Sequence, residues 1–171
     1  MASQWPPREV VNLRDHLDIL ASAVEGTQKG DVSDAIVGWL ARFLVVRSCG
    51  YLEQVVVEAC RVYVRKRSGG LVQMFAYSWL ERTGNPSPES LTRLVRRFDG
   101  TLGDELDSFL DADDQSLRRQ VHFLVDRRNQ IAHGLNEGVG IRKALDLKGT
   151  ACDVADWFIL KFNPQREVPS L

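Results

Sequence analysis

The residues best suited to chemistry lie close together in one segment, Asp126 to Gly134. This segment contains Arg128, Asn129 and His133. A histidine exchanges a proton near neutral pH, and an arginine keeps its charge and forks onto phosphate oxygens. Asn129 precedes His133 by four residues, which places both side chains on the same face of a helix. The segment therefore predicts a site for proton transfer beside a phosphate group.

The position of Arg128 on its helix needs an explanation. On a helical wheel of about 100° per residue, Arg128 falls on the apolar stripe that contains Val121 and Leu124. A guanidinium that faces the core is costly unless it is paired, because it cannot escape by losing its proton. Glu53 is the only charged residue on one stripe of a long earlier helix. We therefore predict a buried ion pair between Arg128 and Glu53.

Other partners and another role remain open for this pair. Arg47 is a second possible partner for Glu53, and Arg127 is a neighbouring arginine that could reach the same carboxylate. The pair could also do no more than fix the register of two packed helices. His133 has a structural alternative as well, in which it interacts with the carbonyl groups that end its helix.

These residues resemble the signature of the HEPN superfamily. In that superfamily an Arg and a His near the end of a late helix are separated by a few residues, and Asn commonly follows the Arg. Arg128-Asn129-Gln130-Ile131-Ala132-His133 has this pattern with four intervening residues. The segment Arg47 to Glu53, within an earlier long helix, is similar to the acidic-residue region of some subfamilies. The chain thus resembles the RiboL-PSP and MAE-like HEPN families.

The resemblance implies a homodimer that cleaves RNA without a metal ion or another cofactor. RNA supplies its own nucleophile, the 2′-hydroxyl, so the protein needs only to transfer protons and to stabilise charge on the phosphorane. His133 would be the general acid or base, Arg128 would bind phosphate oxygens, and Asn129 would orient the imidazole or a phosphate oxygen. The products would carry a 2′,3′-cyclic phosphate and a 5′-hydroxyl.

The geometry of an ideal helix leaves a difficulty, because Arg128 and His133 point about 140° apart. The helix could end or distort near Gly134, Arg128 could reach round the helix, or a second subunit could complete the site. A net charge of −1 gives no overall field that attracts nucleic acid. A dimer cleft would therefore also have to concentrate positive charge locally.

A second class of function keeps the HEPN fold without catalysis. Such a chain would be a helical interaction module that binds a partner protein or RNA. It would bury His133 or lack the dimer, and it would present an apolar patch elsewhere. By analogy with the family, the nuclease would be a toxin or defence effector, with an antitoxin or another regulatory protein as its partner.

The charged residues outside the motif are expected to be mostly solvated helix faces. Some of the arginines could line a path for RNA, although no aromatic residues alternate with them as in a base-stacking platform. The acidic stretch Asp104 to Asp114 would repel RNA, and it could instead bind a basic partner or keep the protein soluble. The arginines in question are Arg93, Arg96, Arg97, Arg118 and Arg119, with a second group at 61–67.

Composition and cysteine spacing predict one cytoplasmic domain. With 171 residues, 44% of them apolar, the chain has the size of a single globular domain, 1–171. We expect an ordered core of about 8–163 with short frayed tails. Cys49, Cys60 and Cys152 fit neither a disulfide framework nor a zinc site, so they are expected to be buried thiols in a reducing cytosol. Apolar stretches are interrupted well before ~18 residues, so no membrane span is expected.

Hydrophobic periodicity predicts an all-α bundle with a long central helix and a late helix that carries the motif. The long helix is expected to begin near a capping Asp31 and to end at Arg67. Apolar residues on more than one of its faces, among them Ile36 and Phe43, predict that it is buried. The other helices are predicted at 8–25, 71–82, 88–98, 102–110, 114–134 and 141–162.

Overall fold

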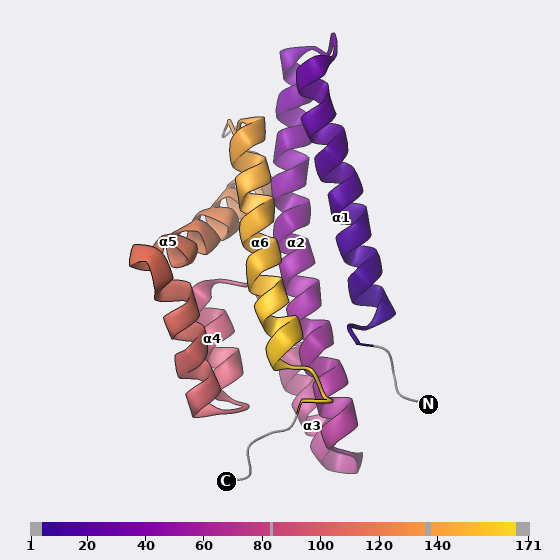
Figure 1. Cartoon of the computed structure of the whole chain (residues 1–171), viewed down its shortest axis with the longest axis vertical. Coiled ribbons are helices and arrows are strands. Elements are labelled where there is room, and N and C mark those ends of the chain that lie inside the picture. The colour runs from indigo at the N-terminus through magenta and orange to yellow at the C-terminus, as the bar shows by residue number, and fades with distance from the viewer. Residues whose placement is uncertain (1–4, 83, 136–137, 167–171) are drawn as a thin grey trace.

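The computed structural model describes residues 5–82, 84–135 and 138–166, and every regular element in these ranges is a helix (Figure 1). The prediction of an all-α bundle is confirmed. The tails that were predicted to fray include residues 1–4 and 167–171, which lie outside the described residues. The elements are α1 (Arg8–Gly26), the short 3-10 helix η1 (Thr27–Lys29), α2 (Asp34–Arg67), α3 (Gly70–Leu80), α4 (Pro88–Arg96), α5 (Gly100–Ala132) and α6 (Ile141–Lys161).

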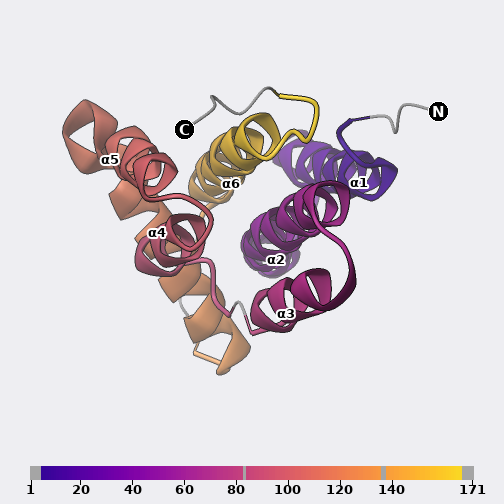
Figure 2. The ribbon, with the colours of Figure 1, turned by 90° about the horizontal axis from the view of Figure 1, so that it is seen from below.

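Helix α2 is the centre of the bundle, as its apolar pattern predicts. It packs against α1, α3, α5 and α6, and Figure 2 shows it between α1, α6 and α3. Leu44, Leu52 and Val55 on α2 are fully buried, each burial contributing roughly 1.5–3 kcal/mol. By length and composition alone α2 would also qualify as a membrane span. Within the bundle, 39% of that apolar window is buried.

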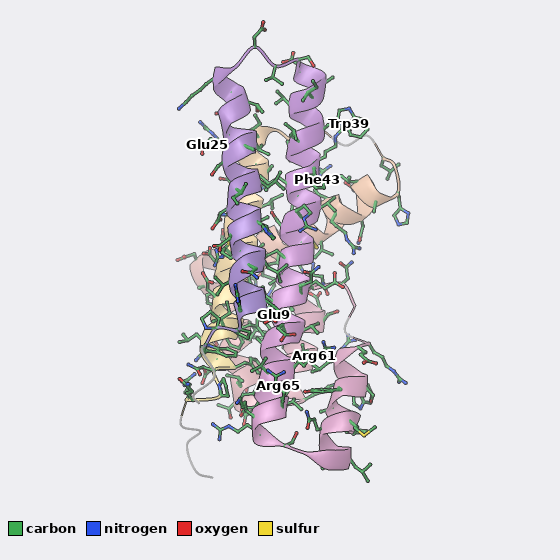
Figure 3. The ribbon with its side chains drawn as sticks, turned by 90° about the vertical axis from the view of Figure 1, so that its right-hand side faces the viewer. Glu9, Glu25, Trp39, Phe43, Arg61 and Arg65 are labelled. Atoms are coloured by element: carbon green, nitrogen blue, oxygen red, sulfur yellow. The ribbon has the colours of Figure 1, made fainter. Side chains whose placement is uncertain are left out.

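Two expectations for the start of α2 are wrong. The helix begins at Asp34 after Ser33 as N-cap, with no side-chain cap, so Asp31 does not cap it. Ile36 and Phe43 are about half exposed, at 52% and 51%. An apolar face is buried only where a neighbouring helix covers it, and here α1 covers one side. Figure 3 shows Trp39 pointing away from α1.

A bend in the middle of α5 gives its two halves different directions (Figure 1). Asp113, Asp114 and Gln115 have φ of 50°, 56° and 60°, which is the left-handed region. A break at this point was predicted from Asp113 and Asp114 as capping residues, and the structure confirms it. Left-handed backbone costs roughly 1–2 kcal/mol for each non-glycine residue. The bend lets α5 pack against α4 and also against α2 and α6.

The cysteines are buried free thiols, as predicted from their spacing. Desolvation by burial raises the pKa of Cys49 to about 11, although the charge of Arg128 lowers it. Burial also raises the pKa of Cys60 and Cys152. At neutral pH all three are therefore neutral thiols and poor nucleophiles.

Candidate functional site

The end of α5 determines where His133 lies. The backbone N–H groups of His133, Gly134 and Leu135 donate to carbonyls of the last turn at 3.0–3.1 Å. Gly134 has a φ of +76°, and the pattern is a Schellman motif, which favours glycine at that position. The imidazole of His133 is exposed and forms no hydrogen bond or ion pair with the residues that the structure describes. The terminal carbonyls are thus satisfied by the backbone, and His133 does not cap the helix with its side chain.

Arg128 lies against α2 beside Glu53. Its Nη2 is 3.8 Å from Oε2 of Glu53, and the two side chains are 35% and 34% exposed. The predicted ion pair is confirmed, but the prediction that it is buried is wrong. The pair lies close to the end of α5, where solvent reaches both side chains. A pair as exposed as this contributes no more than about 1 kcal/mol to stability.

The other two arginines that were predicted to support the site do not contact Glu53. Arg47 is exposed and forms no ion pair with a described carboxylate. Arg127 donates from Nη1 to Oε1 of Gln130 at 3.1 Å, and its guanidinium lies 4.7 Å from the ring centroid of Phe123. Glu53 therefore takes Arg128 as its partner among these three arginines.

Asn129 is held between two donors. Nη1 of Arg128 donates to Oδ1 of Asn129 at 3.0 Å, and Nδ2 of Asn85 donates to the same oxygen at 3.4 Å. Oδ1 of Asn85 is buried and has no hydrogen-bond partner among the described residues. Sequence reasoning missed Asn85, because Asn85-Pro86 marks only a turn and no periodicity relates it to a residue 44 positions later.

Arg128 and His133 remain on different sides of α5. The non-helical residues inside this helix are 112–115, so no distortion turns His133 toward Arg128. Arg128 does reach round the helix as far as Asn129, which shares a face with His133. No hydrogen bond within the described chain joins Arg128 to His133. One chain thus supplies an exposed imidazole on one face and a guanidinium that extends toward it.

A polar strip continues from His133 back along α5. His122 and Asn129 precede His133 by about three and one helical turns on the same side of the helix. Nε2 of His122 is 2.9 Å from Oε1 of Glu89, which belongs to α4. Within the described ranges, no group of three or more His, Cys, Asp and Glu side chains could hold a metal ion.

Comparison with known proteins gives one match. The family model described as RiboL-PSP-HEPN matches residues 10–161 of the chain, which extend from α1 to the end of α6 and include the whole candidate site. No curated protein and no solved structure matches the chain.

Proposed function

The chain belongs to the RiboL-PSP-HEPN family of the HEPN superfamily, and from this premise we propose that it is an endoribonuclease that needs no metal ion. HEPN domains of this family are associated with ribonucleases. The observation that carries the proposal is the exposed imidazole of His133, one helical turn from Asn129, to which Arg128 donates a hydrogen bond. These are the groups that cleavage of an RNA phosphodiester by its own 2′-hydroxyl requires.

The proposed reaction is an in-line transfer at phosphorus. The imidazole of one His133 removes the proton of the 2′-hydroxyl, the 2′-oxygen bonds to phosphorus, and the bond to the 5′-oxygen breaks. The leaving 5′-oxygen takes a proton from a second imidazole or from water. Arg128 and the amide of Asn129 stabilise the charge on the phosphorane oxygens. The products are a 2′,3′-cyclic phosphate and a 5′-hydroxyl.

We propose a homodimer as the active form, because one chain carries one such imidazole. The surface best suited to a second copy is the exposed apolar side of α3, which we call the α3 face: Leu71, Val72, Met74 and Phe75. Leu71 is 83% exposed and Phe75 67%. A contiguous apolar surface of this kind is typical of an interface. Figure 3 shows α3 and the C-terminal half of α5 standing out from α2 on the same side, so a second copy docked here would bring its own α5 near.

Replacing Met74 and Phe75 together with aspartate should convert the dimer to a monomer. Burying an unpaired carboxylate costs about 3–5 kcal/mol, so we expect the dissociation constant to rise by at least about 100-fold. Sedimentation velocity measures this change directly. Ile19→Asp is the matched control, because Ile19 is also 67% exposed but lies on α1. A double variant that stays dimeric would contradict the role of the α3 face.

The α3 face also favours a second candidate function, a non-catalytic interaction module. In that case the four apolar side chains would bind a partner protein, and His133 would be an exposed residue without a reaction. If the nuclease is a toxin, a regulatory protein on the α3 face would have to displace the second copy of the chain.

Cleavage of RNA in the presence of EDTA separates the two candidates. The purified chain is incubated with a single-stranded RNA and with a structured RNA, and the product ends are identified. We expect fragments with 2′,3′-cyclic phosphate and 5′-hydroxyl ends, and no cleavage of DNA of the same sequence, which lacks the nucleophile. Intact RNA in every reaction would favour the interaction module, and cleavage of DNA would exclude the proposed reaction.

A further inference from the structure

A groove between α4 and α5 gathers arginines that are spread along the sequence. It has a volume of about 520 Å³ and is lined by Arg93 and Arg96 of α4, by Arg97 at the C-cap of α4 and by Arg118 of α5. Glu89, Thr92 and Asp107 complete the lining. We call it the arginine groove. Several of these residues had been expected to be solvated helix faces, and here they face a common hollow.

The aspartates beside the arginine groove pair with two of its four arginines. Asp107 is 2.8 Å from Nη2 of Arg96 and 2.9 Å from Nη2 of Arg118. Asp104 also pairs with Arg96, and Asp111 with Arg118. Desolvation raises the pKa of Asp107, but the hydrogen bonds from Arg118 and Thr92 and the charges of both arginines hold it below its usual value. Three carboxylates of the acidic stretch that was expected to repel RNA are thus in ion pairs here.

Arg93 and Arg97 stay outside this network. They lie one turn apart, Arg93 on α4 and Arg97 at its C-cap, and neither guanidinium forms a hydrogen bond or ion pair with a residue that the structure describes. The guanidinium of Arg97 lies 4.1 Å from the ring centroid of Trp79, which fixes its position while its N–H edges stay available. Two exposed guanidinium groups without carboxylates favour a phosphate ligand.

The arginine groove and His133 lie along one side of α5. Arg118, His122 and His133 fall within a sector of about 60° on the regular second half of this helix, and Arg118 lies about 22 Å from His133 along the axis. His122 contacts Glu89, which also lines the groove. A mononucleotide cannot span this distance, but a polynucleotide strand can.

We propose that the arginine groove binds the phosphate backbone of the RNA strand whose cleavage we assign to His133, with Arg93 and Arg97 as the phosphate ligands. This inference rests on the proposed function, because it extends the same substrate along α5. The groove then contacts a part of the RNA far from the reacting phosphate, and this contact increases the affinity for long RNA. Arg93 and Arg97 also bring positive charge to the strand, which the net charge of −1 of the whole chain does not.

Binding of RNA that cannot be cleaved tests the groove separately from catalysis. The probe is a fluorescein-labelled 20-nucleotide RNA with 2′-O-methyl sugars, whose affinity is measured by anisotropy from low to high salt. For Arg93→Gln with Arg97→Gln we expect at least about a 10-fold loss of affinity at low salt, and a salt slope lower by about 1.4, as for two lost phosphate contacts. The control, Arg8→Gln with Arg65→Gln, removes the same charge from α1 and from α2 and should leave both quantities unchanged. Figure 3 shows Arg65 on α2.

The outcomes distinguish this inference from the proposed function. An unchanged salt slope and affinity in the Arg93/Arg97 variant would overturn the groove, even if the wild type cleaves RNA. A selective loss of affinity in a protein that cleaves no RNA would support the groove as an RNA site and reject the nuclease. If the Arg93/Arg97 variant cleaved long RNA more slowly than the wild type but cleaved a dinucleotide at the wild-type rate, both the groove and the nuclease would be supported. An equal loss on the dinucleotide would overturn the groove, because it would indicate damage near His133.

Discussion

His133→Ala is expected to lower kcat/KM for RNA cleavage by about 10²–10⁴-fold, the range that general acid–base catalysis contributes. The imidazole is exposed and contacts no other described side chain by a hydrogen bond or ion pair, so its removal should take away proton transfer and little else. The Schellman motif that ends α5 uses backbone groups, and alanine leaves it intact. We therefore expect the free energy of unfolding to change by less than about 0.5 kcal/mol.

The other two histidines supply matched controls for this measurement. His122→Ala removes an imidazole from the same strip of α5 together with its contact to Glu89. His16→Ala removes one from α1. Both variants should keep kcat/KM within a few-fold of the wild type. A His133→Ala protein that still cleaves RNA at the wild-type rate would show that the reacting imidazole is elsewhere. If His122→Ala lost as much kcat/KM as His133→Ala, the reacting site would lie closer to the arginine groove.

The features that could be predicted from the sequence are those with a helical period. The apolar stripe of α5 predicted that Arg128 needs a partner, and the lone charge on one stripe of α2 identified Glu53, 3.8 Å away in the structure. The break near Asp113 was predicted from another local signal, the capping residues Asp113 and Asp114. A stripe predicts which side of a helix faces the bundle, but it does not say how far along the helix its neighbours extend. The expected burial of Ile36 and of the Arg128–Glu53 pair failed for that reason.

The contacts that could not be predicted join segments with no periodic relation. Asn85 reaches Asn129 from a loop, and Arg97 packs on Trp79 from another helix. In the sequence no aromatic residue alternates with the arginines, yet folding puts a tryptophan against one of them. Such pairs depend on how the loops and helices that carry them are placed relative to one another, and no periodic pattern along the sequence gives that placement.

Arg128→Ala is expected to lower kcat/KM by about 10²–10³-fold, which is the cost of removing one donor that stabilises a transition-state oxyanion. The loss should appear in kcat, because the charge that Arg128 stabilises develops only in the transition state. Arg128→Lys should recover only part of the activity, because an ammonium keeps the charge but cannot donate as a planar fork. Full activity in the lysine variant would mean that Arg128 acts only as a positive charge.

Glu53→Gln distinguishes a role in catalysis from a role in helix register. If the pair only fixes register, then Arg128→Ala and Glu53→Gln remove the same interaction, and both should cost no more than about 1 kcal/mol of stability without changing kcat. If Arg128 binds the phosphate, Glu53 competes with the substrate for one edge of the guanidinium, since its Oε2 is 3.8 Å from Nη2. Glu53→Gln should then keep or raise kcat, whereas Arg128→Ala loses it. An unchanged kcat in both variants, with equal losses of stability, would assign the pair to the fold and leave His133 without its phosphate ligand.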